Sequence, residues 1–187
     1  MGRQLGPLAD LMLARAAEQL PVGAWTYEPK WDGFRCLAVV EDGRAQLRSR
    51  QHRPLTDRFP EIAGALAEQF RGLQVVLDGE LVAFHGGRTD FSALQRRLSG
   101  ARAGVITLVL FDVLAVDDED VRPLPYRQRR AVLDQLGRDL AVALAVTPST
   151  EDLAVARTWM VEHAAAGIEG VVAKHRDHGY RPGARAW

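Results

Sequence analysis

Residues 28–35 of the chain read EPKWDGFR and contain the pattern Lys-x-Asp-Gly-x-Arg, from Lys30 to Arg35. At average residue frequencies, a chain of this length matches the pattern by chance only about 0.002 times. The Asp-Gly pair predicts a tight turn at the edge of a sheet, where backbone can approach a ligand closely. Lys30 becomes a nucleophile once its amine is neutral, and the forked guanidinium of Arg35 binds phosphate or ribose oxygens. The stretch therefore indicates a reactive lysine beside an anion-binding group, and the alternative is a solvated surface turn.

Lysine is rare in the rest of the chain. Of the 24 basic residues, 22 are arginine, and the two lysines are Lys30 and Lys174. An ammonium can lose its proton and act as a nucleophile, whereas a guanidinium effectively cannot. We therefore expect the two lysines to stand where arginine cannot replace them.

The length fits one globular domain, or one domain plus a fragment. The chain has 187 residues, 47% of them apolar, and a formal net charge of zero. No run of 18 apolar residues and no secretory signal occurs, and the single Cys36 excludes an internal disulfide. These features predict a cytoplasmic protein with no membrane span. The zero net charge argues against strong DNA binding by this chain alone.

The local patterns predict an α+β fold with mostly antiparallel sheets flanked by helices. Asp42-Gly43 indicates a β-hairpin, and Asp78-Gly79 is interpreted as a turn between two short strands within 74–84. Thr56 or Asp57 is expected to cap a helix. Helices are predicted at 7–20, from Thr56 to Phe70, from Asp90, at 126–137 and at 151–166 (closed by Gly167), and further strands at 25–29, 36–41, 44–49, 105–116, 141–147 and 168–174.

Three further motifs follow in order: LDGEL at 77–81, FDVL at 111–114 and EGVVAK at 169–174. With the lysine motif, they resemble motifs I, III, IIIa and IV of the covalent nucleotidyltransferases, which comprise ATP-dependent DNA ligases, RNA ligases and mRNA capping enzymes. Both lysines of the chain fall within these motifs. Each motif alone is weak, since Asp-Gly also marks turns and an aromatic residue in an apolar strand is more often core.

Further stretches are similar to the bacterial ATP-dependent DNA ligases of non-homologous end joining. Glu169 favours ligases over capping enzymes. The other stretches are 7–35, Ser49-Arg50, 57–61, 90–95, Pro125-Tyr126 with Arg129-Arg130, and 180–183. The resemblance covers essentially the whole chain. It implies the ATP-grasp-like nucleotidyltransferase fold of DNA ligases, with residues 1–187 as the adenylation domain.

The resemblance also implies the site. Lys30 is expected to attack the α-phosphate of ATP and to form a lysyl-AMP used for sealing DNA breaks in repair, recombination and replication. The nucleotide-binding residues it implies are Glu28, Arg35, Arg50, Glu80, Phe111 and Lys174. Glu80 and Glu169 are expected to hold Mg²⁺ (or Mn²⁺). The implied DNA partner is nicked or broken double-stranded DNA in the nucleoid. Two arginine clusters are candidates for contacting the DNA backbone, with solvated surfaces as the alternative. The first cluster is Arg48, Arg50, Arg53 and Arg58, and the second is Arg96, Arg97 and Arg102.

The sequence departs from the family pattern at its end. It stops at Trp187, before the motif V lysines and an OB-fold domain, so we expect an adenylation domain truncated before motif V. A separate OB-fold-bearing chain or end-joining proteins would then be partners. Two alternatives stay open at this point: an RNA ligase or capping-type guanylyltransferase, and a catalytically incompetent nucleotide- or DNA-binding remnant.

Overall fold

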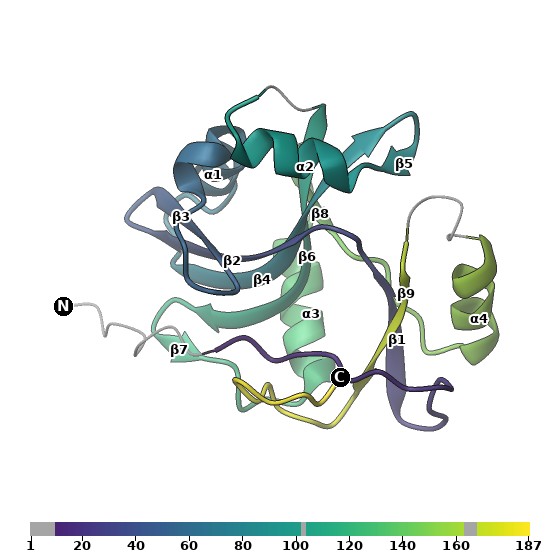
Figure 1. Cartoon of the computed structure of the whole chain (residues 1–187). Coiled ribbons are helices and arrows are strands. Elements are labelled where there is room, and N and C mark those ends of the chain that lie inside the picture. Colours follow the sequence, from purple (N-terminus) through teal and green to yellow (C-terminus); the bar gives the residue numbers. More distant parts are fainter. Residues whose placement is uncertain (1–9, 102–103, 163–167) are drawn as a thin grey trace.

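A curled seven-stranded sheet organises most of the chain, and a separate pair of strands lies beside it (Figure 1). The structure is a computed structural model that describes residues 10–101, 104–162 and 168–187. Its elements are β1 (Trp25–Lys30), β2 (Phe34–Glu41), β3 (Arg44–Ser49), η1 (Thr56–Arg58), α1 (Pro60–Gln69), β4 (Val75–His85), β5 (Arg88–Thr89), α2 (Phe91–Leu98), β6 (Val105–Val116), β7 (Glu119–Asp120), α3 (Tyr126–Leu136), β8 (Leu144–Val146), α4 (Leu153–Glu162) and β9 (Gly170–His175).

The large sheet has the order β3-β2-β4-β6-β7, with β5 added to β4 and β8 added to β6. Every pair in it is antiparallel except β6 and β8, which are parallel. The hairpin predicted at Asp42-Gly43 is confirmed, because both residues have the positive φ angles (50° and 69°) that a two-residue hairpin turn requires. The prediction of an α+β fold with mostly antiparallel sheets is likewise confirmed.

Helices α1 and α2 cover one face of this sheet (Figure 1). The core between them includes Leu47, Ile62, Leu66 and Leu94, all fully buried. Burying a side chain of this size stabilises the fold by roughly 1.5–3 kcal/mol. The expected cap at Thr56 or Asp57 is wrong, because both lie in η1 and α1 begins one turn later with a proline at its first position.

The opposite face of the sheet is covered by two irregular segments from the two ends of the described chain. Leu11 and Met12 pack there with Tyr180 in a second buried cluster. The helix predicted over 7–20 is wrong over its described part, 10–20, which has no helix. The backbone of Leu13 bonds instead to residues 184 and 186, at 2.8 and 2.9 Å, so its hydrogen bonds go to the C-terminal segment.

The turn expected at Asp78-Gly79 is also wrong, because β4 runs unbroken from Val75 to His85. Asp78 is fully buried within the strand, and the pairing with β6 shifts register between Asp78 and Gly79. A Cβ on Gly79 would lie 2.8 Å from the carbonyl oxygen of Val109. The glycine therefore allows close approach of two strands rather than a reversal of the chain.

Strands β1 and β9 form the small antiparallel sheet, and α4 packs against it. The remaining predicted helices and strands are found within a few residues of their predicted limits. The proposed closure of the last helix by Gly167 lies outside the described residues. The gap between the small sheet and the second face of the large sheet is the setting of the candidate site.

Candidate functional site

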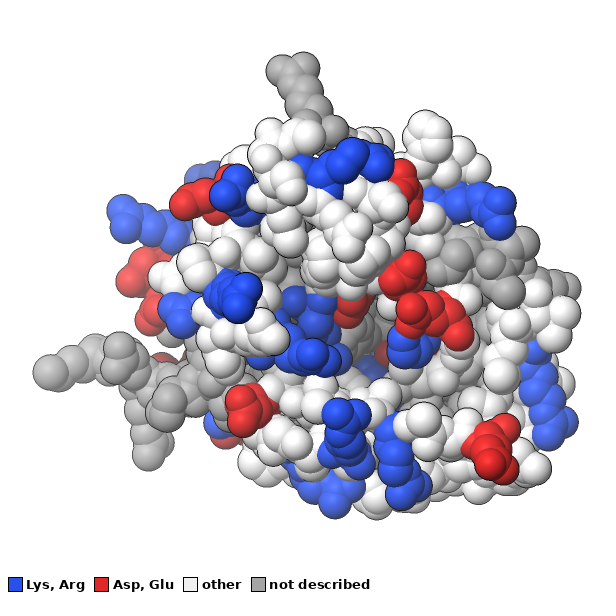
Figure 2. All heavy atoms as spheres, in the orientation of Figure 1, with Lys and Arg blue, Asp and Glu red and all other residues white. Residues whose placement is uncertain are grey.

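A cavity of about 280 Å³ lies between the two sheets. Its walls combine β1 and β9 with β2, β4 and β6, and the two irregular end segments close it. The lining residues are Leu13, Ala14, Glu28, Pro29, Lys30, Trp31, Arg35, Arg50, Glu80, Phe111, Val172, Lys174, Arg185 and Trp187. The lining thus includes Lys30 and all six residues predicted to bind a nucleotide. Figure 2 shows a hollow near the middle of this face, with both basic and acidic side chains on its rim.

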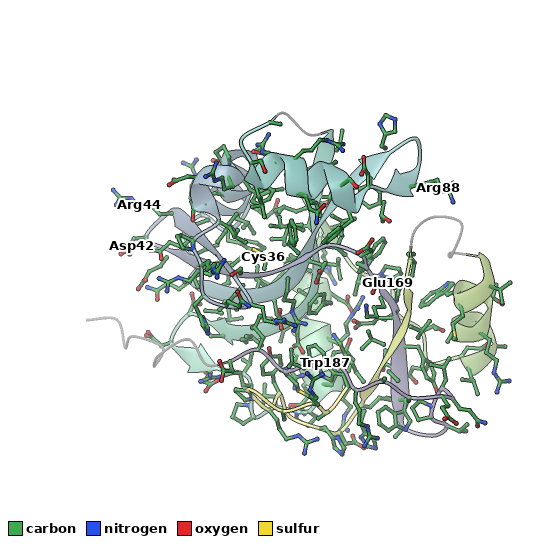
Figure 3. The ribbon with its side chains drawn as sticks, in the orientation of Figure 1. Cys36, Asp42, Arg44, Arg88, Glu169 and Trp187 are labelled. Carbon is green, nitrogen blue, oxygen red and sulfur yellow. The ribbon has the colours of Figure 1, made fainter. Side chains whose placement is uncertain are left out.

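Lys30, which lines this cavity, is paired with Glu169. Lys30 is the last residue of β1, and its Nζ contacts a carboxylate oxygen of Glu169. The side chains are 46% and 47% exposed, so both remain open to a ligand. The backbone N–H of Glu169 also donates to the Lys30 carbonyl at 2.9 Å. Figure 3 shows Glu169 beside the start of β9, between the two sheets.

The turn after Lys30 is shaped by Gly33. A Cβ at this position would lie 2.1 Å from the carbonyl oxygen of Leu81 and 2.8 Å from Cγ of Glu80. Only glycine lets the turn approach β4 this closely. The glycine of the first motif is therefore required by packing, and Lys30 and Glu80 line the same cavity.

Arg35 is held rigidly by Asp78. Nε and one terminal nitrogen of Arg35 donate to the two oxygens of Asp78 at 2.5 and 2.6 Å. The hydroxyl of Tyr180 donates to the same carboxylate at 2.8 Å. Burial alone lowers the pKa of Arg35, but the charge and hydrogen bonds of Asp78 raise it well above its usual value. The guanidinium lies 4.6 Å from the centre of the Phe111 ring, as a cation over an aromatic face.

Glu80 faces Arg35 across β2 and β4. Burial raises the pKa of Glu80 to about 8, while Arg35 opposes the rise and Asp78 adds to it. No cluster of three or more His, Cys, Asp or Glu side chains suited to a metal occurs in the described part of the chain.

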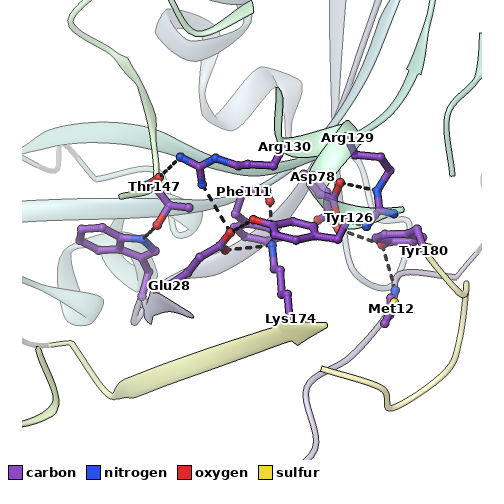
Figure 4. A network of polar contacts seen from close by, with 12 residues as sticks. Met12, Glu28, Asp78, Phe111, Tyr126, Arg129, Arg130, Thr147, Lys174 and Tyr180 are labelled. Atoms are coloured by element: carbon purple, nitrogen blue, oxygen red, sulfur yellow. Dashed lines mark hydrogen bonds and ion pairs between the residues drawn. The ribbon is translucent and has the colours of Figure 1, made fainter. Parts of the chain in front are cut away.

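Glu28 and Lys174 form a buried ion pair at the other end of the cavity, with 2.8 Å between Nζ of Lys174 and Oε2 of Glu28 (Figure 4). Both side chains are almost fully buried. Nζ also donates to the Phe111 carbonyl at 2.7 Å and lies 4.5 to 4.9 Å from the ring centres of Phe111, Tyr126 and Trp187. A lysine this deeply enclosed is a fixed donor rather than a solvated surface charge.

A second cavity of about 570 Å³ adjoins the first and shares Arg35, Arg50 and Glu80 with it. Arg53 and Arg58 also line it, so three members of the first predicted arginine cluster lie together. Arg48 is outside it and bonds to Gln46.

The second predicted arginine cluster is not brought together in this way. Arg96 and Arg97 are paired with Asp90 and Glu61, which neutralise them. Arg102 lies outside the described residues.

Several residues that shape the site have no role predicted from the sequence. Trp31 lines the cavity, and its Nε1 donates to Thr147 at 2.9 Å. Asp78 and Tyr180 hold Arg35 from two different segments. Tyr126 and Arg130 reach Glu28 from α3, and their only signal in the sequence was the resemblance of 125–130 to ligases.

None of the helices in the described residues is long and apolar enough to cross a membrane.

Comparison with known proteins gives one consistent result. Residues 8–187 match the family model described as ATP dependent DNA ligase domain. DNA ligase C2 of Mycolicibacterium smegmatis is 37% identical over 187 residues, which cover 96% of this chain and 52% of that protein. The multifunctional non-homologous end joining protein LigD of Pseudomonas aeruginosa is 39% identical, over 90% of this chain and 20% of that protein. The chain thus spans about half the length of DNA ligase C2.

Among solved structures, a mycobacterial DNA ligase D complexed with ATP and MES superposes with a TM-score of 0.80. It is 32% identical to this chain, and the match covers 95% of this chain and 57% of the other. The two share the nucleotidyltransferase fold of DNA ligases.

Proposed function

This chain belongs to the ATP-dependent DNA ligase domain family, and from that membership we propose that its cavity binds ATP and that Lys30 takes up AMP covalently. The observation that carries the proposal is the position of Lys30. Its half-exposed amine stands at the cavity that Glu28, Arg35, Arg50, Glu80, Phe111 and Lys174 line. The related ligase D structure holds ATP, which supports the choice of nucleotide.

The proposed reaction is a single phosphoryl transfer. A bond forms between Nζ of Lys30 and the α-phosphorus of ATP, and the bond from that phosphorus to the bridging oxygen breaks. The bonding pair leaves with pyrophosphate. Lys30 must give up a proton first, and Glu169 is the carboxylate in contact with it. Arg35 and Arg50 supply positive charge near the phosphates, as such transfers require.

The residues at the cavity suit Mg²⁺. Glu80 and Glu169 provide hard oxygen donors, and the raised pKa of Glu80 marks a carboxylate whose charge is poorly compensated. Mg²⁺ commonly binds through one or two carboxylates together with substrate phosphates, so two protein ligands suffice. When bound, the ion would offset the negative charge that develops on the phosphate oxygens.

We extend the proposal to sealing of nicked or broken double-stranded DNA with the AMP carried by Lys30. Family membership supports it. So does the second cavity, where Arg50, Arg53 and Arg58 offer guanidinium groups to a phosphate backbone next to the nucleotide cavity. The net charge of zero predicts weak, salt-sensitive binding by this chain alone.

Intact mass spectrometry tests the first step. The chain is incubated with ATP or GTP and Mg²⁺, beside Lys30→Ala and Lys30→Arg. We expect one added AMP on the wild type, no GMP, and no adduct on either variant. Lys30→Arg keeps a cation beside Glu169 but removes the nucleophile. An adduct that persists in both variants would place the reaction elsewhere, and no adduct on the wild type would refute adenylation by this chain.

A further inference from the structure

Helix α3 places two side chains behind Glu28, on the side away from the cavity. Tyr126 donates its hydroxyl to Oε1 of Glu28, and a terminal nitrogen of Arg130 lies 3.4 Å from the same oxygen (Figure 4). Neither residue lines the cavity. Their hydrogen bonds to the site run through Glu28, and the ring of Tyr126 also lies 4.9 Å from Nζ of Lys174.

The two oxygens of Glu28 are divided between two sets of partners. Oε1 faces α3, whereas Oε2 binds the ammonium of Lys174 at 2.8 Å. An ammonium has three donors. Glu28 and the Phe111 carbonyl use two of them, which leaves one for a ligand in the cavity.

The arrangement on α3 is itself anchored. Arg130 also donates to the Thr147 carbonyl at 2.9 Å and pairs with Asp134 at 2.8 Å. The backbone N–H of Tyr126 donates to the His178 carbonyl at 2.9 Å. Tyr126 is 2% exposed, and burial followed by the nearby Glu28 charge raises its pKa well above the usual value, so it stays a neutral donor.

The network extends along β1 away from the reacting lysine, and Glu28 stands two residues before Lys30. Lys174 pairs with Thr26 in the β1–β9 register, whereas Lys30 pairs with Gly170. Four residues of strand separate the backbone positions of the two lysines, while Nζ of Lys174 bonds to Glu28, whose backbone lies about 7 Å along the strand from Lys30. A group held at the Lys174 end is therefore the part of the nucleotide remote from the α-phosphorus.

We propose that Tyr126 and Arg130 are positioning residues. They hold the Glu28 carboxylate in place, and through it they orient the remaining N–H donor of Lys174 toward the base end of the nucleotide. The inference rests on the proposed ATP site. It assigns a role to the 125–130 stretch that the ligase reaction itself does not use. Glu28 and Lys174 would contact the nucleotide equally before and during phosphoryl transfer. Loss of their positioning therefore weakens ATP binding without lowering the rate of AMP transfer at saturating ATP.

The test measures AMP uptake by intact mass over a range of ATP concentrations at fixed Mg²⁺. Removing a hydrogen bond to a charged group predicts at least a tenfold higher half-saturating ATP concentration in Tyr126→Phe and in Arg130→Gln, about the magnitude such bonds carry. The maximal rate changes less than about threefold. Arg130→Lys, which keeps the charge, recovers part of the loss.

Two controls separate positioning from general weakening of the fold. Arg127→Gln removes an arginine from the same helix that pairs with Asp177 rather than Glu28, and it leaves half-saturation unchanged. In the Glu28→Gln background, Tyr126→Phe adds no further loss, because the two residues act as one unit.

Provided that the wild type takes up AMP, three results would each overturn the inference. The half-saturating ATP concentration could stay unchanged in Tyr126→Phe and Arg130→Gln, or Arg127→Gln could raise it equally. The third result is a further rise when Tyr126→Phe is added to Glu28→Gln. If the wild type takes up no AMP, the proposed function itself is refuted.

Discussion

Arg35 and Asp78 lie on the same face of neighbouring strands and are joined by two hydrogen bonds of 2.5 and 2.6 Å. Asp78 is fully buried, and its carboxylate accepts hydrogen bonds from this partner and from Tyr180. The pair in turn holds the guanidinium over Phe111 at the wall of the cavity. A residue of the proposed nucleotide site is thus fixed by a carboxylate that the sequence marked only as a turn.

The first prediction concerns this pair. Arg35→Lys keeps the charge but loses the forked geometry, so it leaves part of the Asp78 carboxylate unpaired in a buried site. We expect the free energy of unfolding to fall by about 2–4 kcal/mol and AMP uptake to slow at least tenfold. Urea unfolding and intact mass spectrometry measure the two effects. Arg44→Lys, at the hairpin tip shown in Figure 3, is the control and should change neither.

The contrast between two Asp-Gly pairs shows what sequence alone could predict. Asp42-Gly43 forms the predicted turn because nothing but local backbone geometry decides it. Asp78-Gly79 has the same letters, yet partners 43 and 102 residues away in the chain, Arg35 and Tyr180, keep Asp78 inside a strand. The helix predicted over 7–20 is absent from its described part for the same reason, since the backbone of residues 10–15 bonds to residues 183–187.

The residues of the candidate site also fall into a group that the sequence predicts and a group that it does not. Motif spacing and resemblance identified residues such as Lys30, Glu80 and Lys174, and the fold brings them to one cavity. The residues that hold them in place come from other elements and carry no motif of known role. Tyr126 reaches Glu28 across 98 residues of sequence, a contact that only the three-dimensional fold creates.

The second prediction is a pH dependence of stability at Glu80. Burial raises the pKa of Glu80 from the ordinary 4.5 to about 8. Between these values the unfolded chain has lost a proton that the folded chain keeps, so the free energy of unfolding falls as the pH rises. Glu80→Gln removes this fall and should be more stable than the wild type at pH 8.5 by a few kcal/mol, roughly the energy of such a shift.

Urea unfolding at pH 5, 7 and 8.5 gives the comparison. The wild type and Glu80→Gln should converge at the lowest pH and separate at the highest. Glu41→Gln, which changes an exposed carboxylate at the end of β2, should follow the wild type throughout. Parallel curves for the wild type and Glu80→Gln would show that Glu80 is ionised in the folded chain at neutral pH.

The third prediction concerns the proposed metal ion. Glu169→Gln keeps the size of the side chain and a polar contact for Lys30 but removes a charged oxygen ligand. We expect the Mg²⁺ concentration for half-maximal AMP uptake to rise about tenfold or more, because ligand charge sets the affinity of such sites. Glu151→Gln, which loses only its pair with Arg176, is the matched control. If Glu169→Gln and the wild type gave identical Mg²⁺ titrations, Glu169 would not be a ligand of the metal.

The last prediction tests Phe111 as the surface that receives the base. Its ring lies beneath the cations of Arg35 and Lys174, at 4.6 and 4.8 Å, and meets Trp187 edge-on at 6.0 Å. Phe111→Leu keeps an apolar side chain but removes the aromatic face. The half-saturating ATP concentration should rise about three- to tenfold, the energy typical of one aromatic contact.

Phe70→Leu supplies the comparison for Phe111→Leu, because Phe70 is buried in the core at the C-terminal end of α1 and does not line the cavity. Removing part of that ring should lower the free energy of unfolding by about 1–3 kcal/mol and leave the half-saturating ATP concentration unchanged. AMP uptake over a range of ATP concentrations, together with urea unfolding of both variants, separates the two effects. If Phe111→Leu lost stability but kept the wild-type ATP dependence, the ring would be a packing residue and the base would bind elsewhere in the cavity.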